Sequence, residues 1–120
     1  MSMGSVDMVE EIVPYSQLEG AWINKGIALD GQGRYDEAIK AYDKAIGLDR
    51  HDAKTWNNKG ATFAKQGKYD DALQHFEFAI QLDPDYSMAW GNRGTALEKL
   101  GRTAEAQAAF AKAKELGYTS

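Results

Sequence analysis

The sequence contains no cysteine and only two prolines among its 120 residues. Without cysteine, disulfides, thiolate zinc ligands and cysteine nucleophiles are excluded. No apolar run approaches the roughly 20 residues of a membrane-spanning helix, and the start of the chain lacks the basic and apolar regions of a secretory signal. Acidic residues outnumber basic ones by 18 to 14, which argues against a nucleic-acid-binding surface. We therefore expect a soluble, cytoplasmic protein that binds neither nucleic acid nor membrane.

The chain does contain a strict internal repeat. Its three tryptophans, Trp22, Trp56 and Trp90, are each 34 residues apart, and a fixed period of this length is typical of repeat architectures. Other columns keep the same step: Asn24, Asn58 and Asn92; Gly26, Gly60 and Gly94; Gly33, Gly67 and Gly101; Ala38, Ala72 and Ala106; Tyr42, Phe76 and Phe110. We predict repeats over residues 19–52, 53–86 and 87–120, preceded by a separate N-terminal segment, residues 1–18.

Each repeat has the pattern of two helices. Apolar and small residues recur at intervals of three, four and seven, and the pattern is interrupted where Gly33, Gly67 and Gly101 can end a helix. A second interruption contains Pro84, which cannot continue a helix. The predicted helices are residues 20–31, 35–48, 54–65, 69–82, 88–99 and 103–116. The glycine in the middle of each first helix indicates a close helix contact, which we expect opposite the alanine column.

These columns resemble the tetratricopeptide (TPR) repeat, whose signature is W-x2-L-G-x2-Y, then A-x3-F, then P. Lys25, Lys59 and Arg93 stand where the signature has leucine, and we expect their aliphatic stems to cover the repeat interfaces while their charged ends reach water. The resemblance implies an all-α, right-handed α-solenoid of three helix-turn-helix units. It also implies that the first helices line a concave groove that receives an extended peptide or a partner's helix.

Projection of the repeat pattern places ten candidate binding residues in this groove: Ile23, Asn24, Ile27, Lys54, Asn57, Asn58, Lys65, Met88, Asn92 and Lys99. Asparagine amides both donate and accept hydrogen bonds, so the asparagine column can pair with the backbone of an extended peptide. The isoleucines and Met88 suggest apolar pockets, and the lysines suggest steering of a ligand.

The family also contains a carboxylate clamp for acidic C-terminal tails of chaperones, which takes lysine and asparagine from one repeat, asparagine from the next, and lysine and arginine from a third. Ile23, Ile27, Met88 and Asn92 occupy four of these places, and only Asn58 matches. A clamp depends on charge-assisted hydrogen bonds, so the sequence argues against it.

No pattern for catalysis is present. His51 and His75 share no ligand spacing with carboxylates, and no serine or threonine has a base arranged beside it. We therefore expect no enzyme, no metal and no cofactor. The predicted function is a non-enzymatic protein–protein interaction module; the alternatives are a self-assembling scaffold, formed through the N-terminal segment or an uncovered first repeat, and a co-chaperone.

The two ends of the repeat array differ. In the last repeat, Gln107 and Lys114 replace apolar residues of the earlier repeats, as expected of a polar end that no further helix covers. The N-terminal end has no such polar residues. Three roles are compatible with the apolar and acidic segment 1–18: a cap on the first helix, a free tail, or the occupant of a groove, either its own or a neighbour's.

Overall fold

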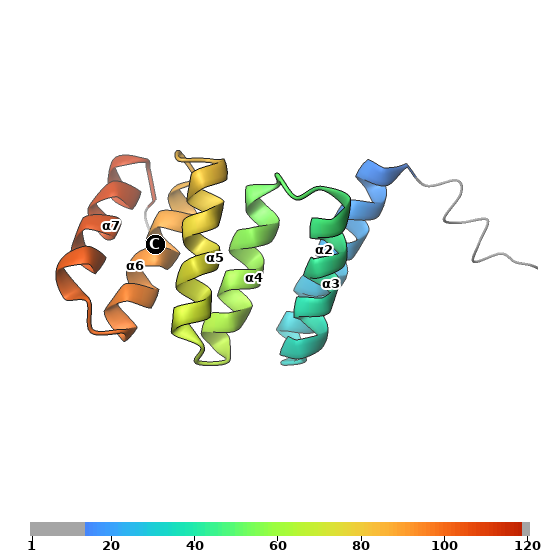
Figure 1. The fold of residues 1–120 in the computed structure, drawn as a ribbon, viewed down its shortest axis with the longest axis horizontal. Helices are drawn as coiled ribbons and strands as arrows, with labels where there is room; N and C mark the ends of the chain where they lie inside the picture. Colours follow the sequence, from blue (N-terminus) through green and yellow to red (C-terminus); the bar gives the residue numbers. More distant parts are fainter. Residues whose placement is uncertain (1–13, 119–120) are drawn as a thin grey trace, which may run out of the picture.

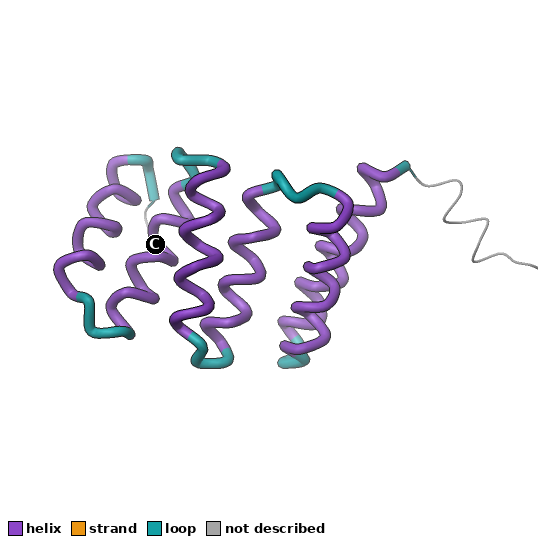
Figure 2. Tube along the Cα trace, in the orientation of Figure 1, coloured by secondary structure: helices purple, strands orange, loops and turns teal. Residues whose placement is uncertain are grey.

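The computed structural model describes residues 14–118, which form six α-helices and no strands in that range. The helices follow one another as three antiparallel pairs along the long axis of the molecule (Figures 1 and 2). Their bounds are α2 (Tyr15–Gly31), α3 (Tyr35–Leu48), α4 (Ala53–Lys65), α5 (Tyr69–Leu82), α6 (Ser87–Lys99) and α7 (Thr103–Glu115). The chain is an all-α solenoid of helix-turn-helix units.

Helix α2 begins earlier than the repeat pattern predicts. It starts at Tyr15 instead of residue 20, directly after Pro14, whose carbonyl accepts from the backbone N–H groups of Gln17 and Leu18 at 3.0 Å each. Proline is well suited to precede a helix because its fixed φ is compatible with the entry and it has no N–H group that would need an acceptor. The first helix therefore has an additional turn that α4 and α6 lack.

The turn inside each pair depends on a glycine. Gly33, Gly67 and Gly101 have φ values of 77–78°, a left-handed conformation that other residues rarely adopt. In the second repeat, the N–H of Lys68 just after this glycine donates to the carbonyl of Phe63 at 2.9 Å. This hydrogen bond satisfies a carbonyl group in the last turn of α4 that has no partner within the helix.

The two helices of each pair meet where the mid-helix glycine faces an aromatic ring. A Cβ added at Gly60 would lie 2.7 Å from Cε1 of Phe76, and one at Gly26 would lie 2.5 Å from Cε1 of Tyr42. The expectation that these glycines face the alanine column is therefore wrong: the glycine makes room for the tyrosine or phenylalanine, which lies one helical turn further along. Tyr42 and Phe76 are 2% and 1% exposed.

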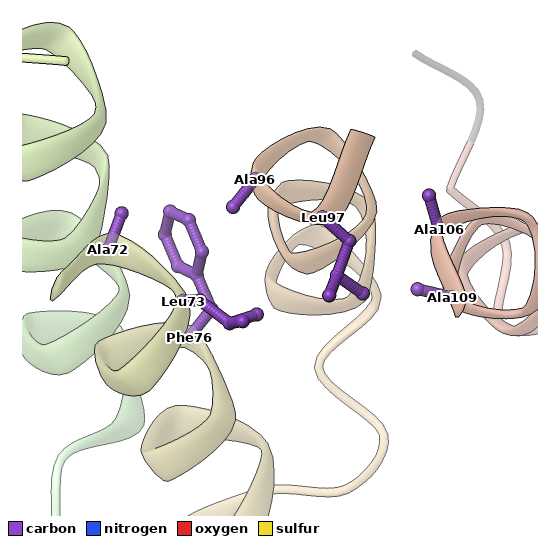
Figure 3. Close-up of a cluster of buried hydrophobic side chains, with 7 residues drawn as sticks. All are labelled: Ala72, Leu73, Phe76, Ala96, Leu97, Ala106 and Ala109. Atoms are coloured by element: carbon purple, nitrogen blue, oxygen red, sulfur yellow. The ribbon is translucent and has the colours of Figure 1, made fainter. Parts of the chain in front are cut away.

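Successive pairs pack through the side chains shown in Figure 3. Phe76 and Leu73 of α5 lie against Leu97 of α6, and the small residues of α7 close the far side. The complete cluster is Ala72, Leu73, Phe76, Ala96, Leu97, Ala106 and Ala109. This cluster joins the second repeat to the third, whereas Leu29, Ala38, Ala41 and Tyr42 form a separate cluster within the first repeat.

Candidate functional site

The asparagine column lies on the first helices of the three repeats. Asn24 of α2 is exposed, whereas Asn58 of α4 and Asn92 of α6 are half-buried. The Asn92 side chain donates from Nδ2 to Oδ1 of Asn57 at 3.0 Å, which leaves its own carbonyl oxygen as an acceptor. We call the predicted groove residues Asn24, Ile27, Asn58, Met88 and Asn92, all of which are at least partly exposed, the amide face.

Asn57 lies beneath this face, 1% exposed. Its Nδ2 donates to the hydroxyl of Tyr86 at 3.4 Å, while its Oδ1 accepts from Asn92. Asn57 thus connects α4 to α6 and satisfies its own buried polar atoms, as a buried amide must. Ile23 is also buried, at 6%. The structure therefore does not place Asn57 or Ile23 where a ligand could contact them directly.

Two large apolar side chains project from the amide face into solvent. Ile27 of α2 and Met88 of α6 are each 49% exposed, and they are the exposed large hydrophobic side chains of the described residues. An exposed methionine or isoleucine gains free energy when a partner covers it, about 1 kcal/mol for half of such a side chain. The amide face therefore combines hydrogen-bonding groups with two apolar contact points.

The three predicted lysines differ in their surroundings. Nζ of Lys65 lies 2.5 Å from Oδ2 of Asp30 in α2, and Thr62 donates to Oδ1 of the same carboxylate at 3.1 Å. This network connects α2 to α4, so the charge of Lys65 is balanced within the protein. Lys54 and Lys99 are exposed. They are therefore better placed than Lys65 to attract an acidic ligand.

Two tyrosines near the amide face were not predicted. Tyr86 precedes α6 and is half-buried, with its hydroxyl at Asn57. Tyr118 follows α7, and its ring covers Gly91, where an added Cβ would lie 2.7 Å from Cε2. Because both residues belong to the connections and not to the periodic helices, the repeat pattern contains no signal for them.

A carboxyl group with an altered affinity for protons lies beside the start of α4. Burial, and then the neighbouring Asp52 carboxylate, raise the pKa of Glu19 from 4.5 to about 7. One oxygen of Glu19, Oε2, is shielded from solvent and has no hydrogen-bond donor among the described residues. Asp52 is held in place because its Oδ1 accepts from the backbone N–H of Lys54 at 3.0 Å, which caps α4.

We expect Glu19→Gln to stabilise the protein above pH 7 and to have little effect below pH 4.5. Between these values the folded protein binds a proton at Glu19 that the unfolded chain has released, because the pKa is raised on folding. The wild type therefore loses stability as pH rises through this window. Since Glu19 is partly exposed, solvent screening limits the difference to on the order of 1 kcal/mol.

Urea unfolding of both proteins from pH 4 to pH 8 measures this difference. Glu98→Gln, which alters an exposed carboxylate of α6, is the matched control. If the unfolding free energies of wild type and Glu19→Gln differ by the same amount at every pH in this range, the raised pKa of Glu19 would be contradicted.

No helix in the described part of the chain is both long and apolar enough to cross a membrane. Over the same residues, no cluster of three or more potential metal ligands occurs. The described part of the chain is thus an α-solenoid whose first helices carry the asparagine column and two exposed apolar side chains.

Comparison with protein families identifies this solenoid. A tetratricopeptide repeat model matches residues 20–52 and 53–86, and a second tetratricopeptide repeat model matches residues 75–108. The chain belongs to the tetratricopeptide repeat family. No curated protein matches its sequence.

Several solved structures are similar over most of the chain. The second TPR of Spaghetti (RPAP3), bound to the HSP90 peptide SRMEEVD, is 32% identical over 83% of this chain and 93% of its own, with a TM-score of 0.80. The Arabidopsis OM64 TPR domain is 29% identical over 87% and 86%, with a TM-score of 0.83. The Sgt2 TPR domain from Aspergillus fumigatus is 26% identical over 82% and 65%, with a TM-score of 0.80.

Proposed function

We propose that this protein is a non-enzymatic interaction module that binds an extended segment of a partner protein along the amide face. The observation that carries the proposal is the exposure of Ile27 and Met88, at 49% each, on first helices that also carry the asparagine column. Two further findings support the proposal. The chain belongs to the tetratricopeptide repeat family, and one of the structures similar to it is a complex with a peptide.

The polar and apolar groups have separate roles in this proposal. Asn24, Asn58 and Asn92 pair with the backbone of the ligand, which requires no particular ligand sequence. Ile27 and Met88 contact apolar side chains and therefore select for them. Lys54 and Lys99 attract ligands with acidic residues, an effect that increases the association rate and weakens as salt is added.

The proposed ligand is an extended segment with two separated apolar residues, and not an acidic tail held by its terminal carboxylate. Apolar side chains stand at three of the positions that would have to supply the clamp's lysines and asparagines, namely Ile23, Ile27 and Met88. Ile23 is in addition buried. A co-chaperone function of the clamp type is therefore not what we propose.

Peptides selected from a random library on the wild-type chain test the proposal. We expect Ile27→Glu combined with Met88→Glu to weaken their binding at least about tenfold, because two half-exposed apolar contacts of about 1 kcal/mol each are lost. Fluorescence anisotropy of a labelled peptide measures the change.

The matched control is Gln74→Glu combined with Gln107→Glu. This pair changes the net charge equally at two exposed positions on the second helices α5 and α7. Equal weakening by both pairs would attribute the effect to charge alone, and unchanged binding by both would place the peptide elsewhere on the surface. Either result would contradict the proposed function.

A further inference from the structure

One face of α2 is open in the first repeat although its equivalents are buried in the other two. Ala21, Lys25 and Ala28 of α2 are all exposed. The residues 34 and 68 positions later are Thr55, Lys59 and Thr62 in α4, and Ala89, Arg93 and Ala96 in α6. The four non-basic residues of that set are 0–1% exposed. We call the open surface of Ala21, Lys25 and Ala28 the α2 face.

The covered equivalents show what kind of group fits this face. Helix α3 covers α4, and Nζ of Lys59 lies 2.7 Å from Oδ1 of Asp43. Helix α5 covers α6, and Nε of Arg93 lies 3.1 Å from Oε2 of Glu77. In both cases the preceding helix supplies one carboxylate to the basic residue, and in the second repeat Thr62 also donates to the carboxylate of Asp30 in α2. Lys25 is the third member of this basic column, with its Nζ 5.1 Å from the centroid of the Trp22 ring.

A hollow of about 480 Å³ adjoins the α2 face. Leu18, Trp22 and Leu48 form its apolar wall, and Lys25 and Lys44 lie at its rim. In the second repeat the corresponding space is occupied, because Phe78 packs edge-on against Trp56 with ring centroids 4.4 Å apart.

The first repeat has Lys44 in place of that phenylalanine. A second hollow of about 240 Å³ shares Trp22, Lys25 and Lys44 and adds Lys40 and Glu37, and Glu37 is paired with Arg34. Three lysines and one carboxylate therefore surround an apolar centre, so the edge of the open surface carries an excess of positive charge.

We propose that the α2 face and its hollow bind residues 1–13 of this chain, the segment that the structure does not describe. These residues include Asp7, Glu10 and Glu11 but no lysine or arginine, so their charge is opposite to that of the basic edge. They also include Met8, Val9, Ile12 and Val13, which can fill the apolar wall.

The segment is long enough to reach. From Tyr15 to Lys25, α2 rises by about 15 Å. An extended chain of about 3.3 Å per residue covers roughly 13 Å from Pro14 to Glu10 and roughly 23 Å from Pro14 to Asp7. Direct attachment to α2 also gives the segment a local concentration in the millimolar range, which favours it over free partners.

A second copy stacked end to end is a poorer occupant. The opposite end of the described solenoid presents the exposed side chains of Gln107 and Lys114 on α7. At the position from which Asp43 and Glu77 pair with the basic column, α7 has Ala111, so a stacked copy would bring no carboxylate to Lys25 from that position. The neighbouring Ala104, Ala108 and Ala111 offer little apolar volume for the hollow.

Disulfide trapping in the full chain tests the proposal, since the protein has no cysteine of its own. One variant carries Ser5→Cys with Ala28→Cys, on the α2 face. Its matched control carries Ser5→Cys with Ile27→Cys, which is adjacent in sequence and exposed but belongs to the amide face. In a glutathione buffer, we expect the effective concentration of the Ala28 pair to exceed that of the Ile27 pair at least about tenfold.

The charge requirement is tested in the same assay. Lys25→Glu should remove this preference, whereas Lys68→Glu, in the exposed turn before α5, should preserve it. Equal effective concentrations for both pairs would overturn the proposal by making the segment a free tail. A preference for Ile27 would place the segment on the amide face, and disulfide-linked dimers that increase with protein concentration would assign the α2 face to a second copy; both outcomes also overturn it.

Discussion

Phe76→Ala is expected to lower the free energy of unfolding by about 3–5 kcal/mol, as large-to-small substitutions of buried aromatic residues do. The ring is 1% exposed and lies in the cluster that joins the second and third repeats (Figure 3). Its loss therefore affects two repeats at once. For a domain of this size the corresponding decrease in Tm is roughly 12 °C or more.

The close contact between Phe76 and Gly60 permits a sharper test. Gly60→Leu alone should destabilise the protein by about 1–3 kcal/mol, because its Cβ would lie 2.7 Å from Cε1 and 2.9 Å from Cδ1 of Phe76. Combined with Phe76→Ala, the leucine enters the space that the ring has left. The double variant should therefore be more stable than the sum of the single losses, by about 1–3 kcal/mol.

Gly26→Leu combined with Phe76→Ala is the control for this pair. Gly26 faces the ring of Tyr42 in the first repeat and not that of Phe76. The decreases in unfolding free energy caused by Gly26→Leu and by Phe76→Ala should therefore be additive within about 0.5 kcal/mol. Urea unfolding followed by circular dichroism measures all five variants. Equal coupling in both combinations would show that the effect does not come from the glycine–ring contact.

The sequence predicts the helices well because their signals are local. The 34-residue period and the turn glycines predict α3, α4, α5, α6 and α7 to within one residue at each end. Gly33, Gly67 and Gly101 have the positive φ that their place after a helix requires. The additional turn of α2 was not predicted, since residues 15–18 lie outside the repeat and have no equivalent column to compare.

The neighbours of each side chain were harder to predict than its helix. Asn57 and Asn58 are adjacent, but a step of about 100° around the helix separates the buried amide from the half-buried one. The helical period alone does not determine which side another helix covers.

The basic column illustrates the same limit. Its side chains were expected to reach water, yet Lys59 and Arg93 form ion pairs with residues 16 positions earlier. The two residues of each pair lie on successive helices, on either side of the connection between two repeats. Their pairing therefore depends on how successive repeats pack. Only with this packing known does the exposed state of Lys25 become informative.

The acidic peptide SRMEEVD is expected to bind this chain at least about 1,000-fold more weakly than it binds the second TPR of Spaghetti, whose structure holds it. The clamp's three basic positions are occupied here by Ile23, Met88 and Asn92. Each charge-assisted hydrogen bond contributes about 1.5–3 kcal/mol, and the loss of three exceeds the 4.1 kcal/mol that corresponds to 1,000-fold. Isothermal titration of both proteins with one peptide measures the difference.

The terminal carboxylate distinguishes a weak clamp from no clamp. Amidation of the peptide should change its affinity for this chain by no more than about twofold, because without the basic residues the carboxylate makes no charge-assisted bond. Free-acid peptide that binds more than about tenfold better than the amide would contradict this prediction and support a co-chaperone function.

Partial restoration of the clamp should reverse the result. Ile27→Asn and Met88→Lys alter two side chains that are each 49% exposed, so they introduce polar groups without burying them. Ile23 is left unchanged, because a lysine at a position 6% exposed would incur the desolvation of its charge. With Asn58 already present, the double variant should bind the free acid about tenfold more tightly than the amide. The same substitutions should weaken the binding of library-selected apolar peptides, because both properties depend on the chemistry at positions 27 and 88.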